Sequence, residues 1–274
     1  MQLKYKLIVS DFDGTLRRTE GGVSQTNAQT IRRYVEAGGV FALCTGRMMS
    51  SILPYARQLG LKGLVAAYQG AIIQDVESGK ILRDHRIAWQ DAAEICAYLQ
   101  NYDYHIHVCD GDDFYVNKDD EALAAYEKIC AVRGIVAKQP LSELVRERKI
   151  SPHKILIMCE AEDRSAVLSG VCGRFGSRFY ITTSTDNLVE IVANGSDKGG
   201  ALKFLAEHYG IPLSETIAIG DNFNDLPMIR AAGLGVAVEN GENELKKQAD
   251  FVTRTCDEDG VGYVIRKFGL GEES

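Results

Sequence analysis

The sequence predicts an α/β fold: a doubly wound, Rossmann-like parallel sheet with a smaller α+β domain inserted into the chain. In residues 1–83, short apolar runs alternate with amphipathic helical stretches, as in parallel strands joined by crossover helices. The same alternation returns in residues 193–274. Residues 84–192 differ, because short turns join their strands into pairs and helices separate the pairs. We therefore expect one core built from both ends of the chain and an inserted domain between them.

The first core strand is predicted at residues 6–10, because "KLIVS" is continuously apolar, as in a parallel strand covered on both faces. The helix after it places Ile31, Tyr34 and Val35 on one face. Pro54 is expected to interrupt the next helix. The elements expected in this part are strands over 6–10 and 40–46, helices over 26–39 and 48–60, and a strand followed by a short hairpin within 63–82.

The inserted domain is expected to begin with a helix and an antiparallel hairpin that turns at residues 110–113. The other elements expected there are helices over 88–103, 119–134 and 163–176, a strand over 154–161, and one or two strands over 179–193. The core then resumes with helices over 196–210 and 225–233 and strands over 216–221, 234–240 and 250–255.

Composition narrows the class of protein. The chain has 274 residues, 45% of them hydrophobic, which is enough to form a sizeable core. Its net charge of −7 argues against nucleic acid or an anionic membrane as a partner. No apolar run is long enough to span a membrane or act as a secretory leader, so we expect a cytoplasmic protein, a monomer or small homo-oligomer. The seven cysteines form no Cys-x-x-Cys pair and are expected to be reduced and mostly buried.

Acidic residues follow two predicted core strands at the point where each strand ends. Asp11 and Asp13 follow the first strand, and Asp221 and Asp225 follow the strand at 216–221. The carboxyl ends of parallel strands meet at one edge of a sheet, so these carboxylates are expected to converge. Close carboxylates repel one another unless a cation binds between them, and Mg²⁺ suits such oxygen ligands. The spacing excludes an EF-hand, because Gly14 occupies loop position four and a strand precedes it.

The same edge carries residues suited to phosphoryl transfer. Asp11 can attack phosphorus as a nucleophile, while Gly14 lets the chain turn so that Asp13 serves as a general acid and base. Thr45 and Gly46 follow the second strand and can bind phosphate oxygens. Lys198, at the start of a helix, can offset the charge of the transferring group.

Four segments in order resemble the motifs of the haloacid dehalogenase-like hydrolases, and most closely their Cof-type phosphatases. They are "DFDGTL", "TGR", "SDKGGAL" and "GDNFND", with a cap inserted between the second and the third. The resemblance implies a Mg²⁺-dependent phosphatase of small phosphorylated metabolites that uses an aspartyl-phosphate on Asp11, with Asp13 as acid and base. It implies Mg²⁺ ligation by Asp11, the main-chain carbonyl of Asp13, and Asp221. It implies phosphate contacts from the Phe12 amide, Thr45, Gly46, Lys198 and Asn224, with Asp225 supporting the metal or Lys198.

The sequence departs from this family at one loop and leaves two alternative functions open. Gln69-Gly70 stands where the family commonly has Asn-Gly, and the basic pair Arg17-Arg18 could attract a second anionic group of the substrate. A phosphomutase or phosphotransferase would use the same core residues. A phospho-signalling receiver shares the strand-end aspartates but is about half this length and has an adjacent acidic pair.

Several further residues have a functional and a structural interpretation. Arg47 and Asn194 are candidates for substrate contact, although a salt bridge explains Arg47 and turn chemistry explains Asn194 equally well. His105 and His107 share a strand face that we expect to be partly exposed and not a metal site.

Overall fold

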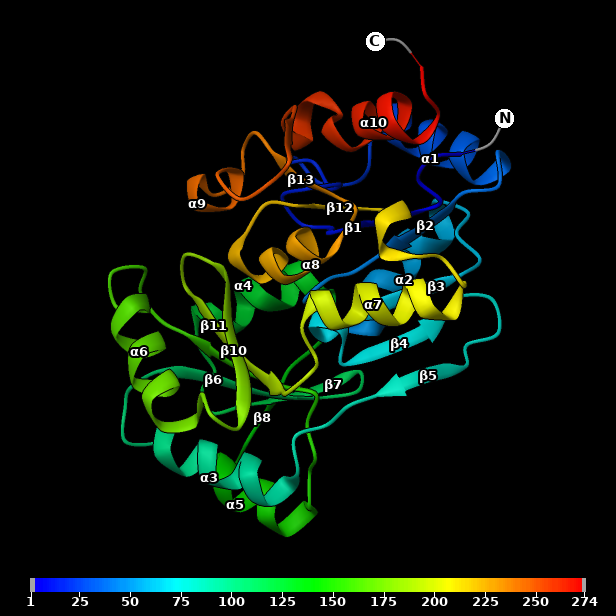
Figure 1. Cartoon of the computed structure of the whole chain (residues 1–274). Helices are drawn as coiled ribbons and strands as arrows, with labels where there is room; N and C mark the ends of the chain where they lie inside the picture. The colour runs from blue at the N-terminus through cyan, green and yellow to red at the C-terminus, as the bar shows by residue number, and fades with distance from the viewer. Residues whose placement is uncertain (1–2, 273–274) are drawn as a thin grey trace.

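The computed structural model describes residues 3–272 and confirms the predicted α/β class (Figure 1). A five-stranded parallel sheet has the order β14-β13-β12-β1-β2. Its central strand β1 pairs with β2 on one side and with β12 on the other, so Leu7 lies beside Thr216. Both ends of the chain thus contribute to one sheet. Its strands are β1 (Leu7–Ser10), β2 (Val40–Leu43), β12 (Thr216–Gly220), β13 (Leu234–Val238) and β14 (Phe251–Thr253).

Helices cover both faces of this sheet. Alternate residues of β1 point to opposite faces, so Ile8 lies in one apolar cluster with Ile31 of α1 and Val9 lies in another with Leu202 of α7. The first face carries α1 (Gln25–Glu36), α2 (Met49–Gln58) and α10 (Gly260–Val264). The second carries α7 (Lys198–His208), α8 (Leu226–Ala231) and the short α9 (Asn243–Lys246).

A small antiparallel sheet, β3-β4-β5, adjoins the parallel one through a bridge between Cys44 and Ala66. It contains the predicted strand and hairpin and leads out of the core. Its strands are β3 (Leu64–Ala67), β4 (Ile72–Asp75) and β5 (Ile81–Asp84).

The second large sheet has the order β10-β11-β9-β6-β7-β8 and is antiparallel except at the β7–β8 pair. One face packs on α3, α5 and α6 through residues such as Ile106 and Ile155, and α3 and α5 lie on the side away from the core (Figure 1). The opposite face carries α4 and meets the core. We call this sheet with α3 to α6 the cap. Its elements are α3 (Trp89–Leu99), β6 (His105–Asp110), β7 (Asp113–Val116), α4 (Glu121–Cys130), β8 (Ile135–Val136), α5 (Leu141–Arg148), β9 (Lys154–Met158), α6 (Arg164–Phe175), β10 (Phe179–Thr185) and β11 (Leu188–Ala193).

Several local expectations are wrong. Val35 is 41% exposed although Ile31 and Tyr34 on the same helix are buried, so the apolar face of α1 is narrower than predicted. Helix α2 continues through Pro54 without interruption. The helix expected over 119–134 ends at Cys130, because Ala131 adopts a left-handed conformation with φ of 56°.

The cysteines are free, and five of the seven are buried, as expected. Within residues 3–272, no helix combines the length and apolar character needed to cross a bilayer. The expected domain boundaries, the cytoplasmic location and the oligomeric state stay predictions.

Candidate functional site

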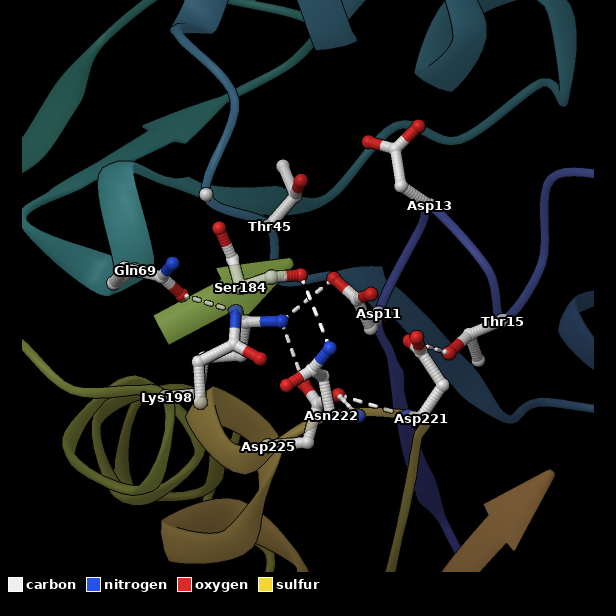
Figure 2. Close-up of polar contacts among 12 residues, drawn as sticks. Asp11, Asp13, Thr15, Thr45, Gln69, Ser184, Lys198, Asp221, Asn222 and Asp225 are labelled. Carbon is white, nitrogen blue, oxygen red and sulfur yellow. Dashed lines mark hydrogen bonds and ion pairs between the residues drawn. The ribbon is translucent and has the colours of Figure 1, made fainter. Parts of the chain in front are cut away.

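Asp11, directly after β1, forms an ion pair with a buried lysine side chain. Lys198, at the first position of α7, has no exposed surface, and its Nζ lies 2.6 Å from Asp11 Oδ1 and 2.6 Å from Asp225 Oδ1 (Figure 2). Burial tends to lower the pKa of the ammonium, but the two carboxylates outweigh it and raise this pKa well above its usual value. Lys198 is therefore a fixed positive charge beside the candidate nucleophile.

Asp225 organises the loop after β12. Its Oδ2 accepts hydrogen bonds from the backbone N–H groups of Asp221 and Asn222, each at 2.9 Å. Asn222 in turn caps the 3₁₀ turn Phe223–Asp225. Gly220 must lack a side chain here, because a Cβ would lie 2.3 Å from Asp225 Cγ. Asp225 thus contacts Lys198 and holds the backbone at Asp221, while the supporting role that the resemblance implies for it stays a prediction.

Three carboxylates cluster at this edge and suit a divalent cation. Asp11, Asp221 and Asp225 each offer an oxygen within 4.8 Å of the others. Burial raises the pKa of Asp11 well above its ordinary value, and burial together with Asp225 raises that of Asp221 to about 7. One lysine cannot balance three carboxylates, so the donor set fits a hard dication such as Mg²⁺.

The Asp13 side chain lies outside this cluster of carboxylates. Gly14 has φ of +77°, which turns the chain, and the Asp13 carboxylate points away from Asp11 (Figure 2). Both of its oxygens accept hydrogen bonds from Arg47, at 2.6 Å from Nε and 2.6 Å from Nη2. Arg47 also donates to the main-chain carbonyl of Ile129, at the end of α4 in the cap. Arg47 therefore makes the salt bridge that sequence analysis offered as one alternative, and it links Asp13 to the cap.

A cavity of about 300 Å³ opens between the core edge and the cap. Thr45, Gly46 and Asn224 line it together with Asp11, as expected of phosphate-binding residues. Lys198 lies behind Asp11, and the Phe12 ring is buried against Tyr55. The roles assigned to these residues stay predictions, but the strand ends do bring most of them together.

The cap contributes residues that sequence analysis missed. Lys154 of β9 and Glu190 of β11 form an ion pair of 3.2 Å in the cavity wall, with side chains only 3% and 2% exposed. Lys154 also donates to the Gly46 carbonyl at 2.9 Å. Gln69, the departure from Asn-Gly, donates to Glu190 at 3.0 Å and accepts from Asn224 at 3.1 Å. In the sequence, the signal that could have identified this ion pair was a single charged residue within an otherwise apolar strand.

Other candidates lie elsewhere. Asn194 is exposed in the turn after β11 and does not line the cavity, so its expected substrate contact is not supported. Arg17 lines the cavity, but Arg18 pairs with Asp259 at 2.9 Å. His105 and His107 are buried, contrary to expectation: His105 pairs with Asp120, and the His107 ring packs on Phe114 and Tyr126.

Comparison with known proteins identifies the family. The family model for haloacid dehalogenase-like hydrolases matches residues 8–265. A Haemophilus influenzae protein named "Putative phosphatase" is 33% identical over 97% of this chain and 98% of its own. A Bacillus subtilis protein named as a 5-amino-6-(5-phospho-D-ribitylamino)uracil phosphatase is 27% identical over 98% and 99%.

The fold agrees with this identification. The crystal structure of a haloacid dehalogenase-like hydrolase from Bacteroides thetaiotaomicron is similar with a TM-score of 0.80 and 31% identity, over 96% of this chain and 99% of that one. The chain therefore belongs to the haloacid dehalogenase-like hydrolase family and is an enzyme of its phosphatase type.

Proposed function

We propose that the protein is a Mg²⁺-dependent phosphatase that hydrolyses small phosphorylated metabolites through an aspartyl-phosphate on Asp11. The observation that carries the proposal is the position of Asp11 at the cavity, held through one oxygen by the Lys198 ammonium. This arrangement orients the carboxylate, and the Lys198 charge offsets part of the burial that raises the pKa of Asp11.

In the first step, an Asp11 oxygen attacks phosphorus, and the bond from phosphorus to the leaving oxygen breaks. Asp13 donates a proton to that oxygen, for which its carboxyl group must exchange its Arg47 contact for the substrate. In the second step, Asp13 removes a proton from water, which attacks phosphorus and releases phosphate and Asp11.

The donor set identifies residues that would hold the cation. Asp11, Asp221 and the main-chain carbonyl of Asp13 would bind Mg²⁺, which offsets the negative charge of the phosphate oxygens. Lys198 would stay a counter-charge for Asp11 and Asp225 throughout. Thr45 and Asn224 would donate hydrogen bonds to the phosphate, as their place on the cavity wall allows.

The cap would exclude bulk water and select the leaving group. It closes the cavity with α4, β9 and the β10–β11 turn, and it contacts the core edge through Lys154 and Gly46. A cavity of about 300 Å³ suits a small metabolite.

The test is phosphate release from a panel of phosphomonoesters with Mg²⁺, with a chelator, and with Asp11→Asn. Asp113→Asn, an exposed acid in the cap hairpin, is the matched control. We expect metal-dependent turnover that Asp11→Asn abolishes and Asp113→Asn leaves intact. Turnover by folded Asp11→Asn at the wild-type rate would contradict the proposal, and phosphate passed to an added alcohol in place of water would indicate a transferase.

A further inference from the structure

Each cation on the cavity wall has a carboxylate close by. Lys154 pairs with Glu190, and Arg47 pairs through two hydrogen bonds with Asp13. Arg17 lies 3.8 Å from the same Asp13 carboxylate. The two arginines thus share the single Asp13 carboxylate, so that end of the wall keeps one excess positive charge. The corner formed by Lys154 and Glu190 is neutral and offers no unpaired positive charge to an anionic group of the substrate.

The wall across the cavity from the core edge is largely apolar. It comes from one side of α4 and from the neighbouring strands β9 and β11. Its side chains are Ala125, Tyr126, Ile129, Cys130, Met158 and Leu188. Hydroxyl groups placed against such a surface would lose water without gaining hydrogen bonds, which disfavours a sugar or polyol that presents hydroxyls on every side.

Hydrogen-bonding groups gather at one corner of the cavity. Glu190 accepts from Lys154, Gln69 and Ser184, and Lys154 also donates to the Gly46 carbonyl. A buried ion pair stabilises a fold little compared with apolar residues of the same size. Its position on the cavity wall is therefore better explained by contact with the polar edge of a ligand.

We propose that the cavity takes a leaving group with one broad apolar face, which packs on α4, Met158 and Leu188, and an uncharged polar edge, which meets Lys154 and Glu190. The inference rests on the proposed function, since it describes the alcohol released from the phosphate ester. Flat ring alcohols that carry few hydroxyls have this chemistry.

The first experiment compares three phosphates of primary alcohols, so that leaving-group acidity stays similar. They are 3-hydroxybenzyl phosphate, a pentitol 5-phosphate and a pentitol 1,5-bisphosphate. We expect kcat/KM for the ring ester to exceed that of the pentitol ester by at least about tenfold, because apolar contact in a pocket changes kcat/KM by this factor or more. The bisphosphate serves as the reference for the Glu190→Gln variant described below. Equal values for the ring and pentitol esters would overturn the proposal.

A variant pair tests the apolar wall. Ile129→Thr makes the wall more polar while leaving the main-chain carbonyl that binds Arg47. Its matched control is Ile135→Thr, an exposed isoleucine of the cap edge strand outside the cavity. We expect Ile129→Thr to lower the ratio of ring to pentitol kcat/KM about fivefold and Ile135→Thr to leave it unchanged. An unchanged ratio in both variants would contradict the assigned wall.

Glu190→Gln tests the charge argument. It leaves Lys154 unpaired at nearly constant volume, so the corner becomes positive. We expect the bisphosphate to improve relative to the pentitol monophosphate at least about fivefold, as an opposite charge favours an anion. A ratio that stays constant in the folded variant would show that the pair does not exclude anions.

Binding of the alcohols separates this inference from the proposed function. Calorimetric titration with 3-hydroxybenzyl alcohol and with the pentitol, with and without chelator, needs no turnover. Absence of phosphate release from every ester of the phosphomonoester panel would defeat the proposed function alone. Equal affinity for the two alcohols would defeat the leaving-group inference alone.

Discussion

The Lys198 ammonium is buried between two aspartates, so its removal should lower the stability of the protein as well as its activity. Lys198→Met leaves Asp11 and Asp225 buried without their counter-charge. We expect the free energy of unfolding to fall by about 3–5 kcal/mol, as when one partner of a buried ion pair is removed. Urea unfolding measures this, with Lys203→Met on the exposed side of the same helix as control. Equal stability of both variants would contradict this account of Lys198.

Gly14 permits the turn that separates Asp13 from Asp11. Its φ of +77° disfavours any side chain, and a Cβ would lie 2.6 Å from Asp221 Oδ2. We expect Gly14→Ala to cost about 1–3 kcal/mol of stability and to lower kcat at least about a hundredfold, because both aspartates shift. Gly22 also has a positive φ, but a Cβ there would meet no atom within 4 Å. Gly22→Ala therefore measures the effect of backbone strain without a steric contact. Equal kcat in the two variants would exclude the steric contact with Asp221 as the cause.

Helix α4 forms part of the apolar wall, and its N-terminus is capped by the residue before it, Asp120. The Asp120 side chain accepts from the Leu123 N–H at 3.1 Å and also binds His105. We expect Asp120→Ala to destabilise the protein by about 1–2 kcal/mol, the usual effect of losing such a cap, and to raise KM. Thermal unfolding and steady-state kinetics measure both effects. Asp119→Ala, at the exposed preceding position, should leave both quantities near wild type.

The junction of β5, the β6–β7 turn and β9 contains a neutral histidine. His153 Nδ1 accepts from the Gly111 N–H at 3.1 Å, so the ring proton lies on Nε2, which is 2.7 Å from Asp84. Burial lowers the pKa of His153, and the bond to Asp84 offsets only part of this effect. The His153 ring stacks on Tyr68 of the core, and protonation of Nδ1 would remove its hydrogen bond from the Gly111 N–H.

The lowered pKa fixes the sign of a pH effect. The unfolded chain takes up the proton near pH 6.5, before the folded protein does, so His153 removes stability as the pH falls below that value. His153→Gln should reduce this slope by up to about 1.4 kcal/mol per pH unit. Urea unfolding between pH 5 and 8 tests it, with exposed His208→Gln as control. A slope equal to that of wild type would mean that another group titrates.

At the scale of the whole molecule, the acidic cluster leads us to expect that stability depends on a bound divalent metal. Mg²⁺ that binds the folded state alone should add about 2.7 kcal/mol at a hundred times its Kd. Asp221→Asn should remove most of this increment and should also stabilise the metal-free protein above pH 7, because burial raises the pKa of Asp221 to about 7. Thermal unfolding with Mg²⁺ and with chelator measures both, and an unchanged metal response would exclude Asp221 as a ligand.

The sequence predicts the core site better than the cap wall, for a physical reason. Asp11 and Asp221 follow apolar strands, and the strands of a parallel sheet all end at one edge, so the alternation of strands and helices already predicts the edge on which both lie. Their contact requires in addition that β1 and β12 be neighbours. Lys154 and Glu190 meet because β9 pairs with β11 in one register, which nothing local specifies. Helix α5 is different, since Leu141, Leu144 and Val145 carry a helical apolar spacing that the sequence interpretation did not use.

The pairing of β1 with β12 has a consequence for synthesis. Leu7 emerges from the ribosome about two hundred residues before its neighbour Thr216 is made. The cap strands pair only among residues 105–193, so the cap sheet can assemble while β1 has β2 beside it but not yet β12. The acidic cluster therefore cannot form before β12 and the loop after it are made, and a nascent chain stopped before residue 216 cannot acquire it.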